Sequence, residues 1–358
     1  MVSISLCMIV KDEEDTLPRC LECVKGVADE IVIVDTGSSD ATKTAAGNYT
    51  DKVFDFPWAD DFSAARNFSF SLAVCDYILW LDADDVLLPG DAARFLELKK
   101  SLDPATDVVM MQYHTGFDAQ GHVTFSYFRE RLVKRSRGFR WFEPVHEYLE
   151  TFGQIVFSDI CITHQKVHPP VPGRNLAIYE TILKGGGSLT PRGLYYYARE
   201  LKDAGRHADA VEAFERFLSE GKGWVEDDIC ACTELAACHK ALGGIREELG
   251  ALLRSLEYDV PRAETCCALG YHFKAKGDYR LAAYWFLQAL DAAEPPESRG
   301  FVQPECHGYI PCIELAVCYD RLGRKEEAFR FNEKAAAFKP GDPSVEYNRK
   351  YFETLAGR

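Results

Sequence analysis

The sequence predicts an α/β domain with a Rossmann-like, mainly parallel sheet, followed by an all-α solenoid of helical repeats. In the first half of the chain, short β-rich runs alternate with amphipathic stretches, which is typical of a parallel sheet covered by helices. Beyond residue 175 the strand signal disappears and a helix–turn–helix pattern recurs. The length of 358 residues suits two domains.

The N-terminal domain is predicted to span residues 1–168. Its expected strands are 3–10, 31–34, 52–56, 77–81 and 107–113. Its expected helices are 13–25, 39–47, 60–74 and 89–101. A more irregular β-rich section follows from 122 to 163, and it carries six basic residues between Arg129 and Arg140.

A cluster of helix-breaking residues, His168-Pro-Pro-Val-Pro-Gly173, marks the end of this domain. We therefore expect a linker or hinge at 169–190 and a helical domain at 191–358.

The helical domain shows a repeat with a glycine at each turn. Its turn glycines are Gly205, Gly243, Gly277 and Gly323, separated by 38, 34 and 46 residues. These separations lie around the 34 residues of a tetratricopeptide repeat. Cysteines occupy positions where two helices of a repeat approach closely, namely Cys232, Cys238, Cys267 and Cys318. Such arrays usually form a concave surface for peptides, and the alternative is a brace that binds nothing.

The composition excludes some classes of function. The net charge is -15, and about 12 of these excess negative charges lie before residue 166, which argues against nucleic-acid binding. No apolar run approaches the roughly 18 residues of a membrane span. The apolar start, Val2–Val10, is read as a strand and not as a signal peptide. Thirteen cysteines without such a signal indicate reduced thiols in a cytoplasmic protein. The pair Cys20 and Cys23 is expected to serve packing.

An acidic turn follows the predicted strand at 77–81. Asp82 and Asp84 are two residues apart, so both carboxylates are expected to face the crevice at the carboxyl end of the sheet. Two such oxygen ligands, with water and phosphate oxygens, suit Mg²⁺ or Mn²⁺ on a diphosphate. Asp85 is expected to cap the following helix instead. The alternative is an acidic turn without a metal.

Two further strands bring acidic residues to the same edge. Asp35 ends the strand 31–34 and is followed by Gly37 and Ser38, which allow a sharp turn. Glu13 follows the first strand. Asp35 is suited to accept a hydrogen bond from a nucleoside base or ribose, so this edge is a candidate nucleotide site.

These motifs resemble those of family 2 glycosyltransferases, which have the GT-A fold. The resemblance covers about the first 165 residues and rests on Met8-Ile-Val-Lys-Asp-Glu-Glu14, Val34-Asp-Thr-Gly-Ser-Ser-Asp-Ala-Thr42 and Leu81-Asp-Ala-Asp84. Trp58-Ala-Asp-Asp-Phe-Ser-Ala-Ala-Arg-Asn67 and Glu143-Pro-Val-His-Glu147, followed by tetratricopeptide repeats, are similar to a bacterial branch that includes peptide S-glycosyltransferases.

The resemblance implies roles for individual residues. Glu13 and Asp35 are expected to contact uridine, and Arg66 to approach the base or diphosphate. Asp82 and Asp84 are expected to hold the diphosphate through Mn²⁺ or Mg²⁺. One departure is Asp12, where relatives commonly have Asn, which leaves the base preference open.

The remaining catalytic groups are expected between residues 129 and 164. A general base must be a carboxylate near the sugar, and Glu147 is favoured over Glu143 because Pro144 commits Glu143 to an extended turn. The alternative is that Glu147 only pairs with an arginine of the basic run. The resemblance to GT-A enzymes also implies a histidine as the third metal ligand, which is expected to be His164 rather than His146, with a core histidine as the alternative. The candidates for a phosphate-binding arginine are Arg131 and Arg140.

Three functions are therefore compared. The first is an inverting transferase that moves a hexose or N-acetylhexosamine from a UDP-sugar to Ser, Thr or Cys of a peptide or protein presented by the repeats. The second acts on a cell-envelope or lipid-linked saccharide. The third is a repeat scaffold with an inactive transferase domain, against which the intact Asp35, Asp82 and Asp84 argue. The sugar, the linkage and the oligomeric state, a homodimer included, stay open.

Overall fold

The computed structural model describes residues 1–117, 121, 123–168, 171–292 and 303–356. The chain forms two compact units, Met1–Gly187 and Ser188–Arg358. Among the helices described, none is long and apolar enough to cross a membrane. The predicted fold class, an α/β domain followed by a helical solenoid, is confirmed.

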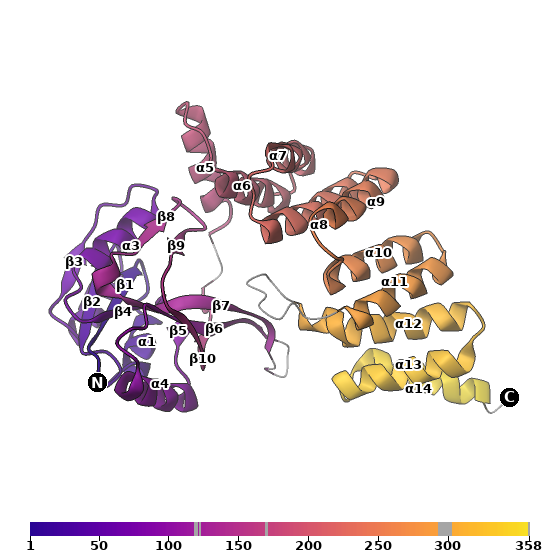
Figure 1. Cartoon of the computed structure of the whole chain (residues 1–358), viewed down its shortest axis with the longest axis horizontal. Helices are drawn as coiled ribbons and strands as arrows, with labels where there is room; N and C mark the ends of the chain where they lie inside the picture. The colour runs from indigo at the N-terminus through magenta and orange to yellow at the C-terminus, as the bar shows by residue number, and fades with distance from the viewer. Residues whose placement is uncertain (118–120, 122, 169–170, 293–302, 357–358) are drawn as a thin grey trace. The chain divides into compact units, whose positions relative to one another are not determined.

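An eight-stranded sheet forms the centre of the first unit (Figure 1). Its strands, in spatial order, are β3 (Val53–Asp55), β2 (Glu30–Asp35), β1 (Ile4–Val10), β4 (Tyr77–Trp80), β7 (Val123–Lys134), β6 (Val108–Phe117), β10 (Ile155–His164) and β5 (Asp85–Val86). Strands β3, β2, β1 and β4 are parallel, and β6 and β10 are parallel to each other. Only β7 and β5 run antiparallel to their neighbours in this sheet. As a result, β1, β2, β4 and β10 all end at the same edge.

The alternation of side chains along the strands creates one core on each face of the sheet. On one face, β1 residues such as Leu6 and Met8 pack with Leu17, Ala46 and Phe95 of the helices α1 (Leu17–Cys23), α2 (Thr42–Gly47) and α4 (Pro89–Ser101). On the other face, the core includes Cys7, Trp80 and Phe70 of α3 (Phe62–Ser71), together with the small sheet β8 (Arg140–Phe142) and β9 (Tyr148–Glu150).

The segment expected as a linker at 169–190 contains the helix α5 (Arg174–Lys184), which belongs to the first unit. Gly173 precedes this helix with a φ of 72°. Pro169 and Pro170 of the predicted breaker cluster lie outside the described residues.

The second unit consists of consecutive helix pairs. The described helices are α6 (Pro191–Asp203), α7 (His207–Glu220), α8 (Val225–Ala241), α9 (Ile245–Arg254), α10 (Ala263–Ala275), α11 (Tyr279–Asp291), α12 (Tyr309–Arg321), α13 (Lys325–Phe338) and α14 (Pro343–Ala356). All four predicted turn glycines lie between the helices of a pair and have φ between 75° and 80°. Because L side chains rarely adopt this conformation, glycine ends the first helix of each pair.

The cysteines have the packing role that the sequence predicted. All thirteen are free thiols. Cys232, Cys238, Cys267 and Cys318 are at most 3% exposed. Cys20 and Cys23 lie in α1, where the Cys23 sulfur accepts a hydrogen bond from the backbone N–H of Leu87 at 3.1 Å.

A close helix contact in the third pair gives a prediction for stability. A Cβ atom added to Gly270 of α10 would lie 2.7 Å from ring atoms of the buried Phe286 of α11. Gly270→Ala is therefore expected to destabilise the protein by about 1–3 kcal/mol. Gly250→Ala in α9 is the matched control, because nothing lies within 4 Å of its added Cβ. The control should be stabilised by up to about 1 kcal/mol through helix propensity. Thermal unfolding of both variants tests this, and equal melting temperatures would contradict it.

Candidate functional site

The acidic turn after β4 is built around Asp85, which is fully buried. Its Oδ2 accepts hydrogen bonds from the Asp82 backbone N–H at 3.0 Å and lies 3.0 Å from Nη1 of Arg131. Its Oδ1 accepts from the Tyr113 hydroxyl at 2.8 Å. The expectation that Asp85 caps the next helix is wrong, because α4 begins after Leu88. Asp85 instead forms the short strand β5 and fixes the turn.

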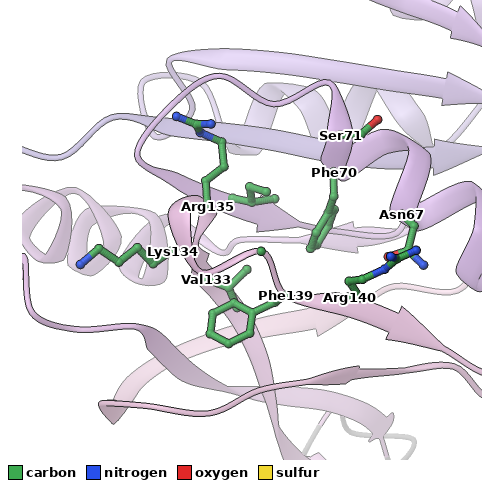
Figure 2. A pocket seen from close by; sticks show the side chains of 10 residues that line it. Asn67, Phe70, Ser71, Val133, Lys134, Arg135, Phe139 and Arg140 are labelled. Carbon is green, nitrogen blue, oxygen red and sulfur yellow. The ribbon is translucent and has the colours of Figure 1, made fainter.

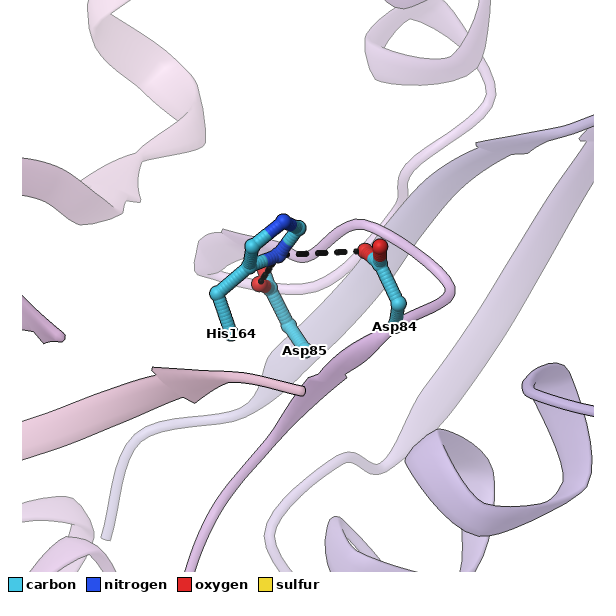
Figure 3. A group of neighbouring side chains, drawn as sticks. All are labelled: Asp84, Asp85 and His164. Atoms are coloured by element: carbon cyan, nitrogen blue, oxygen red, sulfur yellow. Dashed lines mark hydrogen bonds and ion pairs between the residues drawn. The ribbon is translucent and has the colours of Figure 1, made fainter. Parts of the chain in front are cut away.

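His164 joins two of these carboxylates (Figure 3). The register of β10 with β5 pairs His164 with Asp85. The Nδ1 atom of His164 lies 3.3 Å from both Asp84 Oδ1 and Asp85 Oδ1. Burial lowers the pKa of His164, but hydrogen bonds and charge from Asp84 and Asp85 outweigh it and raise the pKa to about 10. The three side chains offer ligand atoms that lie within 4.8 Å of one another.

The donor set of this group fits a divalent cation. Asp84 offers carboxylate oxygens, and His164 offers a ring nitrogen once a cation displaces its proton; both side chains are 22% exposed. The carboxylate of Asp85 already pairs with Arg131 and accepts hydrogen bonds from Tyr113 and the Asp82 backbone N–H. Asp85 therefore positions Asp84 and His164 and is not counted as a ligand itself. Among the described residues this group contains neither Asp82 nor His146.

Asp82 faces a different partner from the one expected. Strand β4 ends at Trp80, so the side-chain alternation that would align Asp82 with Asp84 does not continue into the turn. The Asp82 carboxylate lies 2.7 Å from Nη2 of Arg66. Burial raises the pKa of Asp82, but Arg66 and Arg131 outweigh this effect and lower the pKa to about 2.

Arg66 connects Asp82 to Glu147. Its Nε lies 2.7 Å from Glu147 Oε1, so one guanidinium holds a carboxylate on each side. The guanidinium carbon lies 5.1 Å from the ring centroid of Trp80 and 4.9 Å from that of Trp141. Arg66 is only 8% exposed, and it therefore positions the two acids rather than presenting an open charge to a base or diphosphate.

Glu147 sits in a constrained loop beside this pair. Glu143 and His146 have φ of 75° and 52°, which is unusual for residues other than glycine. The Glu147 side chain is 14% exposed and pairs with Arg66 of α3, not with an arginine of the basic run in the described contacts. The loop therefore places Glu147 against the same guanidinium that holds Asp82.

Asp35 and Glu13 lie at the ends of the neighbouring strands β2 and β1. Asp35 Oδ1 accepts hydrogen bonds from the backbone N–H groups of Gly37 and Ser38, both at 2.9 Å. Its Oδ2 is buried and has no hydrogen-bond partner among the described residues. A buried oxygen of this kind can accept a hydrogen bond from a bound ligand or from an ordered water. Glu13 accepts from the Thr16 hydroxyl, and burial, with charge from Asp84 and Asp82, raises its pKa.

Neither of the two arginines expected to bind phosphate presents an open charge at this edge of the sheet. Arg131 is 0% exposed, and its guanidinium stacks 3.9 Å from the Trp80 ring centroid and pairs with Asp85. It is an interior counter-charge, which corrects the expectation of an open clamp. Arg140 is exposed on β8 and lines a pocket of about 360 Å³ with Lys134 and Arg135 (Figure 2). None of the candidate acids lines that pocket, so the structure does not bring Arg140 to the site.

Sequence analysis missed the roles of Tyr113 and Trp141. The Tyr113 hydroxyl donates a hydrogen bond to Asp85, and its oxygen lies 3.0 Å from Nδ1 of His164. The only sequence signal was its place near the end of a predicted strand. Trp141 stands two residues before Glu143 in the chain, but nothing in the sequence indicated its contact with Arg66.

Comparisons with known proteins agree with this geometry. Residues 5–160 match the family described as Glycosyl transferase family 2. A TPR repeat-containing protein of Synechococcus elongatus is 39% identical over 150 residues, which is 42% of this chain and 36% of that protein. An uncharacterized glycosyltransferase of Rickettsia felis is 37% identical over 87 residues, 24% of this chain and 30% of that protein. The glycosyltransferase SunS of Bacillus subtilis is 23% identical over 228 residues, 60% of this chain and 53% of that protein.

The chain spans about a third of the length of the first two of these relatives. Among solved structures, a thermophilic TPR protein of Thermus thermophilus aligns with a TM-score of 0.37 and 19% identity over 51% of this chain and 92% of its own. The MamA protein aligns with a TM-score of 0.37 and 18% identity over 49% of this chain and 84% of its own.

Proposed function

We propose that the protein is an inverting, metal-dependent glycosyltransferase, and that residues 5–160, which match the glycosyltransferase family 2 model, form its catalytic domain. The donor is a UDP-activated hexose or N-acetylhexosamine. The acceptor is a Ser, Thr or Cys side chain of a peptide or protein that the helical repeats hold.

The convergence of four groups at one sheet edge carries the proposal. Strands β1, β2, β4 and β10 end there, and they bring Glu13, Asp35, the acidic turn and His164 to the same rim. In open α/β sheets, ligands bind at this edge. The unpartnered Oδ2 of Asp35 suits a hydrogen-bond donor of the uridine, and Asp84 with His164 suits a cation on the diphosphate.

The proposed metal is Mn²⁺ in preference to Mg²⁺. Mg²⁺ favours an all-oxygen octahedron, whereas a site with an imidazole nitrogen suits a transition metal. Asp84 and His164 would hold the ion, and Asp85 would orient them through its own hydrogen bonds. When bound, the ion supplies positive charge to the diphosphate of the donor.

In the proposed reaction, the acceptor oxygen or sulfur attacks the anomeric carbon of the sugar. The bond from that carbon to the β-phosphate oxygen breaks, and UDP leaves with the electron pair. Glu147 accepts the proton of the acceptor group, and Arg66 keeps the Glu147 carboxylate in place beside Asp82. A single displacement of this kind inverts the anomeric configuration.

The acceptor class rests on the repeats and on the motif resemblance to peptide S-glycosyltransferases. Helical repeats present an extended surface, which suits a peptide segment. The thirteen free thiols support a reducing, cytoplasmic setting.

The proposal is tested with the full chain and a panel of UDP-sugars, without acceptor. We expect UDP release from at least one UDP-hexose or UDP-N-acetylhexosamine with Mn²⁺, a lower rate with Mg²⁺, and none with EDTA. Glu147→Gln should slow UDP release by about 100-fold or more, because water also needs a base, while UDP with Mn²⁺ still raises its melting temperature. Glu150→Gln, an exposed acid on β9, is the control. A panel without UDP release or stabilisation would refute the donor assignment, and an unchanged rate in Glu147→Gln would refute its role.

A further inference from the structure

An ion pair recurs between the first helices of neighbouring repeats. Lys202 of α6 pairs with Glu234 of α8, and Lys274 of α10 pairs with Glu314 of α12. In both cases the lysine stands three residues before the turn glycine of its repeat. The glutamate stands nine residues before the turn glycine of the next repeat. We call this contact the repeat bridge.

The repeat bridge is interrupted between α8 and α10. Lys240 occupies the lysine position, but the glutamate position holds Ala268. The Lys240 side chain is 59% exposed, compared with 24% for Lys202 and 30% for Lys274. Its ion-pair contact is Glu248 at 3.9 Å, and the other oxygen of Glu248 lies 2.9 Å from Nδ1 of His272. Within the described part of the chain, Lys240 therefore lacks the close carboxylate that Lys202 and Lys274 have.

A cavity of about 460 Å³ lies at this interruption. Lys240 and Ala268 line it, together with the small side chains of Ala236 and Ala237. Leu252 of α9 and Tyr271 of α10 add apolar and aromatic surface. Ala268 lines this cavity at the sequence position where Glu234 and Glu314 pair with a lysine of the preceding repeat.

We propose that this cavity binds an extended peptide segment through an Asp or Glu side chain that takes the place of the missing glutamate. The incoming carboxylate pairs with Lys240, as Glu234 pairs with Lys202 one repeat earlier. A neighbouring apolar side chain of the peptide packs against the alanines and Leu252. Glu248 and Lys274 also line the cavity, but Glu248 lies 2.9 Å from Nδ1 of His272 and Lys274 pairs with Glu314. Lys240 is therefore the weakly paired charge of the cavity, and charge complementarity favours an acidic residue. This proposal concerns only the helical unit and does not depend on glycosyl transfer.

The test uses the full-length protein and two pooled nonapeptide libraries. Both have random residues around a fixed centre, which is Glu in one library and Gln in the other. Retention of each library on immobilised protein is measured without UDP-sugar. We expect the wild type to retain the Glu library about tenfold better than the Gln library. Equal retention of the two libraries by the wild type would overturn the proposal.

Substitutions then locate the binding site. Ala268→Glu should complete the repeat bridge, fill the cavity and abolish the preference for Glu, while its melting temperature stays at or above that of the wild type. Lys240→Gln should abolish the preference and leave the cavity open. Lys202→Gln is the matched control, since it removes the equivalent lysine of an intact bridge, and it should keep the preference. An Ala268→Glu variant that still prefers the Glu library would also overturn the proposal. UDP release from the donor sugar is measured separately. If UDP is released but the preference for Glu is absent, the peptide-binding proposal fails while the proposed transferase function stands.

Discussion

Replacing Asp84 by asparagine is expected to weaken Mn²⁺-dependent binding of UDP by at least about 100-fold. The substitution keeps the shape of the side chain but removes the charge that, with His164, attracts the cation. Without the cation, the diphosphate would approach the carboxylates of Glu13 and Asp82, which repel it. Calorimetric titration with UDP, in Mn²⁺ and in EDTA, measures the effect. In EDTA, the wild type and the variant should bind UDP equally weakly.

The matched control for this experiment is Asp159→Asn. Its side chain is 85% exposed on β10, and its contact with Arg94 is 4.0 Å long. Asp159→Asn removes one negative charge from the same unit as Asp84→Asn does, so it controls for the change in net charge. The Asp159→Asn variant should bind UDP with Mn²⁺ as tightly as the wild type does. If Asp84→Asn binds UDP with undiminished Mn²⁺ dependence, the proposed metal site is wrong.

Strands such as β1, β2 and β4 could be predicted because they are mostly buried and therefore apolar in sequence. The five predicted strands 3–10, 31–34, 52–56, 77–81 and 107–113 correspond to β1, β2, β3, β4 and β6. The repeats were predictable because each turn needs a glycine with positive φ. The short β5 was missed, because two residues carry no periodicity and its pairing with β10 is formed across the fold.

The acids of the site were predictable, but not their partners. Parallel strands place their ends at one edge, so Asp35 and the acidic turn could be located from the sequence. Arg66 is separated by 81 residues from Glu147, and His164 by 79 residues from Asp85. No local pattern encodes such contacts. The turn also breaks the alternation that seemed to place Asp82 and Asp84 on one side, because β4 ends at Trp80.

The second large effect is expected at Arg131, a residue that touches no ligand in the proposed reaction. Its guanidinium is 0% exposed, lies 3.0 Å from Oδ2 of Asp85 and stacks on the rings of Trp80 and Tyr113. Arg131→Met keeps much of the apolar volume but leaves the carboxylate of Asp85 buried without its counter-charge. Breaking a buried pair from one side costs about 3–5 kcal/mol. The free energy of unfolding is measured by urea titration, with hydrogen exchange of the β4 amides to assign the change to the first unit.

A double variant separates the lost charge pair from lost packing. In Arg131→Met with Asp85→Asn, the buried carboxylate is gone, and Asn can still accept a hydrogen bond from the Tyr113 hydroxyl or the Asp82 backbone N–H. We expect this variant to recover at least half of the stability lost in Arg131→Met, because no uncompensated charge stays in the core. If the two losses simply add, the pair contributes nothing as a pair, and the stacking on Trp80 and Tyr113 would account for the conformation of Arg131. A double variant that recovers stability without recovering Mn²⁺-dependent UDP binding would give a further result. It would show that the charge of Asp85 is needed to position Asp84 and His164, and that Arg131 is needed to bury that charge.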